Sequence, residues 1–109
     1  MIEPYKVVSP RNRLTLHRVL YNGGVNSWSV AEVHWKNDEG KAYPALAMRW
    51  NGSEKGTRGF PKVGYWPTWF IVPEELEDAI RREVYRIDPQ GKLGGREWVP
   101  TNFDKGEIK

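Results

Sequence analysis

Cationic and aromatic side chains alternate in one glycine-bearing stretch of this sequence, residues 49–69. Cations neutralise phosphates, and exposed rings stack on unpaired bases, so the two together are the components of a single-strand binding site. Four glycines between residues 51 and 65 would let the backbone approach a polyanion closely. We therefore predict a site for single-stranded nucleic acid, in which four cations hold phosphates and three rings stack bases. The predicted residues are Arg49, Lys55, Arg58 and Lys62, with Trp50, Phe60 and Trp66.

The same residues permit two other interpretations. The rings could line an apolar pocket for a protein or a small ligand, with the cations at its rim. Alternatively, the stretch is an ordinary solvated loop over an aromatic core, because runs of charge usually face water. Binding through phosphates weakens steeply as salt rises, whereas binding in an apolar pocket barely responds, so salt dependence separates the first two interpretations.

Charge is distributed unevenly along the chain. Residues 1–72 contain ten Lys or Arg and five Asp or Glu, whereas residues 73–109 contain seven and nine. The first part therefore has a net charge of +5 and the second −2, which favours an anionic partner for the first part. Six tryptophans are many for 109 residues, so we expect a ring-lined surface or an interface between subunits.

Composition also suggests a compartment. The chain has no cysteine, which excludes disulfides and thiolate metal sites and fits a reducing compartment. No apolar run approaches the roughly 20 residues of a spanning helix, and the first residues lack the apolar core of a signal peptide. We expect a cytoplasmic protein with no membrane partner.

Period-2 alternation predicts three strands before residue 51, and turn-forming residues separate them. A change of face midway through the second strand predicts a bulge there. Pro44 cannot donate a ladder hydrogen bond, so we expect it at a sheet edge or before the paired stretch begins. The strands are predicted at residues 13–21, 27–36 and 41–50, with turns at residues 22–24 and 37–40.

A fourth strand is predicted at residues 67–72, and Pro73 begins a helix directly behind it. Acidic residues in the first turns of this helix and arginines in its last turns match the helix dipole. Its expected buried stripe consists of Leu76, Ala79, Ile80 and Val84.

Residues 1–109 are predicted to form one α+β domain, a twisted antiparallel sheet of four or five strands with one principal helix packed on one face. Residues 1–12 are expected to be an arm or an edge strand, and residues 88–109 a loosely ordered tail. The helix stripe could instead form a twofold homodimer interface. The tail residues expected to dock on the sheet or on a second subunit are Leu93, Trp98, Val99 and Phe103.

The two histidines, His17 and His34, lie on neighbouring predicted strands. A metal site would need a third ligand, and the nearest carboxylate on these strands is Glu32. Counting back from the turn at residues 22–24 places His17 nearer Val30 than His34, so the imidazoles are not expected to meet. We therefore predict neither a metal site nor a cofactor.

Catalytic machinery is not visible in the sequence. The only grouped carboxylates lie in residues 74–78, where the helix dipole already explains them. The sequence contains no GxSxG nucleophile motif, and GKLGG at residues 91–95 lacks the end of a phosphate loop. We predict a non-enzymatic binding protein.

Residues 28–86 run from strands through a basic loop to WFIVPEELEDAI, in which a strand leads directly into a helix that starts at proline. This order is similar to the second half of the PC4-like single-stranded DNA-binding coactivator family. The resemblance implies a sheet crossed by one helix, dimerisation through that helix and single-strand binding on the sheet. That family typically has a tight lysine-rich junction before its last strand, whereas the corresponding stretch of this chain is longer and rich in tryptophan. The segments RWNG and PTWFIVPEEL also look like short uncharacterised bacterial proteins of mobile elements and integron gene cassettes, which implies a bacterial origin.

Overall fold

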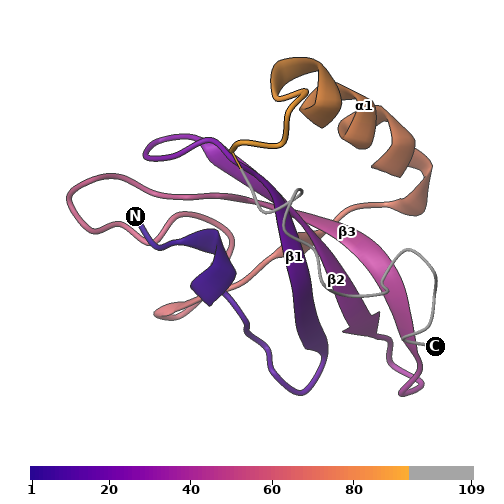
Figure 1. Ribbon diagram of the computed structural model, residues 1–109. Helices are drawn as coiled ribbons and strands as arrows, with labels where there is room; N and C mark the ends of the chain where they lie inside the picture. The colour runs from indigo at the N-terminus through magenta and orange to yellow at the C-terminus, as the bar shows by residue number, and fades with distance from the viewer. Residues whose placement is uncertain (94–109) are drawn as a thin grey trace.

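The computed structural model describes residues 1–93, and these residues form an α+β fold (Figure 1). The central antiparallel sheet has the strand order β1-β2-β3-β6. One principal helix, α1 (Glu77–Ile87), lies against one face of this sheet (Figure 1). The predicted fold class is therefore confirmed. The four strands are β1 (Leu14–Asn22), β2 (Trp28–Lys36), β3 (Ala42–Trp50) and β6 (Phe70–Ile71).

The predicted strand at residues 67–72 is divided between two sheets. Its first part belongs to β5 (Trp66–Pro67), which pairs with β4 (Lys62–Val63) in a small hairpin, and only β6 joins the central sheet. Thr68 and Trp69 separate the two parts. The Trp69 ring is buried on the sheet face opposite α1, and its indole N–H donates a hydrogen bond to the Val7 carbonyl at 2.7 Å.

The strands differ in the regularity of their pairing. The register between β2 and β3 is continuous, from Trp28 opposite Trp50 to Lys36 opposite Ala42. The register between β1 and β2 shifts at His17 and again between Val19 and Tyr21. The bulge predicted in the second strand was therefore placed in the wrong strand, because the extra residues lie in β1.

The Pro44 nitrogen lies on the outer side of β3, which agrees with the predicted position of Pro44 at a sheet edge. The Leu46 carbonyl accepts a hydrogen bond from the N–H of Val72 on the outer side of β3. Residues two apart in a strand direct their backbone groups to the same side, so the Pro44 nitrogen also faces outward. Within residues 1–93, the two-residue β6 pairs only with Ala47 and Met48, which leaves this edge open beside Pro44 in the described part of the chain.

Two small cores lie on the two faces of the sheet. On the face that α1 covers, Val84 is buried and Ile80 and Ile87 are partly buried. Leu76 and Ala79 are exposed, so the predicted helix stripe was wrong at these two positions. Leu76 belongs to the 3-10 turn η2 (Glu74–Leu76) before α1, and the tighter winding of that turn takes it off the stripe.

The ends of the described chain are packed. Residues 1–12 contain the 3-10 turn η1 (Pro4–Lys6), and Val7 is fully buried in the core opposite α1. After α1, the buried Asp88 carboxylate accepts the N–H groups of Lys92 at 3.0 Å and Leu93 at 2.9 Å. The other predicted tail anchors, Trp98, Val99 and Phe103, lie outside the described residues. Between residues 1 and 93, the helices are too short or too polar to cross a bilayer.

Candidate nucleic-acid interface

Arg49 is buried beneath the loop that was predicted to bind phosphates, with 3% of its surface exposed. Its guanidinium donates hydrogen bonds to the carbonyl oxygens of Pro61, at 3.2 Å, and of Arg58 and Thr68. Pro61 and Thr68 flank the β4–β5 hairpin, so Arg49 fixes the base of that hairpin. Burial lowers the pKa of Arg49 to about 10. The prediction that Arg49 holds a phosphate does not fit this position.

Gly59 allows the loop to pass this close to β3. Its φ of 78° lies in the left-handed region, and a Cβ at this position would lie 1.9 Å from the Trp50 carbonyl oxygen. Any other residue would push the loop away from the strand. The close approach permits Trp50 and Phe60 to exchange both backbone hydrogen bonds, at 2.7 and 3.0 Å.

Five large apolar side chains gather at the end of the sheet where β2 begins and β3 ends. Cross-strand pairing places Trp28 opposite Trp50, Trp50 opposite Phe60 and Met48 opposite Phe70. Opposed residues of an antiparallel pair direct their side chains to the same face. Trp28 and Met48 also pack against the core under α1, which identifies the face. We call Trp28, Met48, Trp50, Phe60 and Phe70 the aromatic platform.

The aromatic platform lines an apolar groove with a volume of about 490 Å³, together with Arg49 and Pro61. Trp50, Phe60 and Phe70 are 57%, 63% and 56% exposed. Trp28 is partly covered by the Tyr21 ring, whose centroid lies 4.7 Å from its own. Trp28 therefore packs against the core and the Tyr21 ring, whereas Trp50, Phe60 and Phe70 face solvent.

The β4–β5 hairpin carries a second group of exposed apolar side chains, Val63, Tyr65 and Trp66. Val63 lies opposite Trp66 in the hairpin. Arg58 donates a hydrogen bond from its guanidinium to the Tyr65 carbonyl at 3.1 Å. Arg58, one of the predicted phosphate-binding cations, thus supports the hairpin turn, and its side chain remains exposed.

The structure brings together three of the predicted site residues at the groove, Trp50, Phe60 and the buried Arg49. Lys62 and Trp66 belong to the hairpin, and Lys55 and Arg58 are exposed on the preceding loop. None of these four lines the groove.

Sequence reasoning missed three members of the aromatic platform, Trp28, Met48 and Phe70. Trp28 could have been located to within one residue, because counting outward from the turn at residues 37–40 places it opposite Arg49, next to its actual partner Trp50. Phe70 could not, because its pairing depends on how the long loop returns to the sheet.

A buried ion cluster lies on the face that α1 covers. Glu32 is fully buried, and its carboxylate accepts hydrogen bonds from Arg18 on β1 and from Arg81 on α1, the latter at 2.7 Å. Because the two arginines come from different elements, this carboxylate ties the helix to the sheet.

His17 and His34 lie side by side, with ring centroids 6.0 Å apart. The expected register was wrong, because His34 pairs with Thr15 and the bulge in β1 falls at His17. Burial lowers the pKa of His34. Among residues 1–93, no three side chains of His, Asp or Glu are grouped to hold a metal ion.

Comparisons of the chain with protein-family models, with curated protein sequences and with solved structures found no match. The resemblances to PC4-like coactivators and to gene-cassette proteins stay predictions.

Proposed function

We propose that this protein is a non-enzymatic binding module that holds single-stranded nucleic acid on the aromatic platform. The observation that carries this proposal is the exposure of Trp50, Phe60 and Phe70 on one face of the sheet. Rings left in water contribute little to the core. Unstacked bases cover such rings, and each stacked base contributes roughly 1 to 3 kcal/mol of binding free energy.

Charge near the platform supports the same ligand. Between residues 50 and 70 the chain has three cations, Lys55, Arg58 and Lys62, and one acid, Glu54. All three cations are exposed, and Arg58 and Lys62 each lie two residues from Phe60 in the chain. Their long side chains would contact phosphates of a strand whose bases stack on the rings. As the sequence predicts, we place this module in the cytoplasm.

An apolar peptide or small ligand is the second candidate, and the composition of the groove favours it. Within the described part of the chain, the side chains that line the groove include one cation, Arg49, and main-chain carbonyls already occupy its terminal nitrogens. A ligand bound by apolar contact alone would leave the cations unused.

Tryptophan fluorescence during titration with a short unlabelled oligonucleotide tests the proposal. At about 50 mM salt we expect saturable quenching, and at about 200 mM salt much weaker binding, because phosphate contacts release counterions. Lys62→Gln should lower the slope of log affinity against log salt by about 0.7. Lys41→Gln is the matched control, since Lys41 is an exposed lysine at the opposite end of β3.

Two outcomes would contradict nucleic-acid binding. No quenching at micromolar protein and low salt would exclude it. Affinity that is independent of salt, and equal in the two lysine variants, would favour the apolar ligand instead.

A further inference from the structure

His17 and His34 form a pair that the proposed function does not use. Their rings come from adjacent strands and are nearly perpendicular, with an interplanar angle of 82° and centroids 6.0 Å apart. The bulge in β1 creates this contact, because Leu16 pairs with Val33 and Arg18 with Glu32 while His17 is the extra residue between them. The register shift thus brings His17 beside His34 on the next strand.

We propose that His17 and His34 together bind a divalent cation of the late first transition series, such as Zn²⁺, Ni²⁺ or Cu²⁺. The spacing of the rings supports this. With metal–nitrogen bonds of about 2.0 to 2.1 Å and a tetrahedral angle, the ring centroids of two imidazoles on one ion lie roughly 5.2 Å apart. The observed separation of 6.0 Å is within about 1 Å of that value, so a small change in side-chain torsion angles would bring both rings to one ion. Each imidazole has two nitrogens, so one can bind the metal while the other keeps a hydrogen bond.

The ligand types select the class of metal. Imidazole nitrogen suits Zn²⁺, Ni²⁺ and Cu²⁺, whereas Mg²⁺ and Ca²⁺ prefer oxygen ligands. Glu32 is the nearest carboxylate on these strands, but both of its oxygens accept hydrogen bonds from Arg18 or Arg81. The site therefore has two protein ligands, and water or an external molecule completes the coordination.

The neighbouring charges set the strength of binding. Arg18 and Arg81 both lie against the Glu32 carboxylate, and arginines this near the site oppose the binding of a dication. We therefore expect modest affinity and exchangeable metal. The sequence makes the site easy to test, because the chain has only two histidines and no cysteine.

Thermal unfolding of the full chain with added ZnCl₂ or NiCl₂ measures the binding. We expect the Tm to rise with metal concentration, on the order of 5 °C once free metal exceeds Kd roughly a hundredfold. MgCl₂ should give no such rise. His17→Gln and His34→Gln should each abolish it, whereas Asp38→Asn, which removes an exposed carboxylate, should retain it.

The proposal fails if the wild-type Tm is insensitive to both ZnCl₂ and NiCl₂. It also fails if the variant that combines His17→Gln with His34→Gln shows the same rise in Tm as the wild type, because the metal would then be bound by other groups. Should the glutamine variants not fold, NMR of the wild-type chain with Ni²⁺ or Cu²⁺ decides. Selective broadening of the His17 and His34 signals supports the site, and broadening elsewhere overturns it. None of these outcomes depends on nucleic-acid binding.

Discussion

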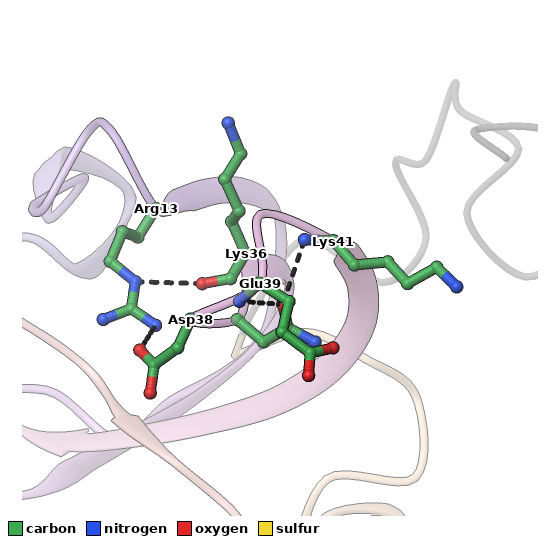
Figure 2. Close-up of polar contacts among 6 residues, drawn as sticks. Arg13, Lys36, Asp38, Glu39 and Lys41 are labelled. Carbon is green, nitrogen blue, oxygen red and sulfur yellow. Dashed lines mark hydrogen bonds and ion pairs between the residues drawn. The ribbon is translucent and has the colours of Figure 1, made fainter.

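The two ends of the central sheet are built from the same three strands but carry opposite kinds of surface. At the end that contains the β2–β3 turn, polar groups pair with one another. Arg13 binds the Asp38 carboxylate and donates to the Lys36 carbonyl, both at 2.9 Å (Figure 2). Within the turn, the Asn37 side chain accepts the backbone N–H of Glu39 at 2.9 Å. At the other end, the aromatic platform faces solvent.

One tryptophan at each end shows the difference most clearly. At the polar end the Arg13 guanidinium lies over the Trp35 ring, 4.6 Å from its centroid. At the aromatic end Trp50 remains 57% exposed, although three cations lie within the next twelve residues of the chain. The chain can therefore cover a ring with a nearby arginine, but among residues 1–93 the platform rings Trp50, Phe60 and Phe70 stay more than half exposed. This contrast supports the proposed ligand-binding role of the platform.

The largest expected effect comes from removing the arginine that supports the aromatic end. Arg49→Met leaves the carbonyls of Arg58, Pro61 and Thr68 without their donor, because methionine cannot replace these hydrogen bonds. We expect the free energy of unfolding to fall by about 2 kcal/mol, as measured by urea denaturation. Amide hydrogen exchange should rise in residues 58–69 and stay unchanged in the β2–β3 turn.

Arg49→Lys is the informative control for this change, because it keeps the charge but not the planar fork of donors. It should recover only part of the stability. A variant Arg49→Met as stable as the wild type would show that the hairpin is held by its own packing.

The next effect concerns ligand binding and compares two exposed rings on one strand. Trp50→Ala should weaken binding of a short single strand about tenfold, since it removes one stacking surface. Tyr43→Ala, at the polar end of β3, should leave the affinity unchanged although Tyr43 is also exposed. Isothermal titration calorimetry avoids the loss of the fluorescent reporter. Equal affinities in the two variants would remove the platform from the binding site.

Much of the fold could be predicted from local patterns. Period-2 alternation located the first three strands to within one residue at each end, and the dipole-matched charges located α1. What failed was the pairing between strands. The extra residue His17 shifts the β1–β2 register, and no residue type marks that position, so the approach of His17 to His34 could not be foreseen.

The candidate site was predicted in residue type but not in arrangement. Trp50 and Phe60 do meet, but Arg49, grouped with them by sequence, faces the interior. An arginine in a strand is normally expected at the surface. Its burial follows from carbonyls contributed by residues 58, 61 and 68 of the returning loop, which only the tertiary structure brings together.

The smallest effect is expected at the polar end. Asp38→Asn removes the ion pair with Arg13, but the Asp38 side chain is 94% exposed. Exposed pairs contribute about 0.5 kcal/mol or less to stability, and Arg13 would keep its hydrogen bond to Lys36 and its position over Trp35. Urea denaturation should therefore give a midpoint close to that of the wild type. A decrease in the free energy of unfolding above about 1 kcal/mol would exceed what exposed pairs contribute. It would mean that charges stabilise the polar end of the sheet as Arg49 stabilises the aromatic end.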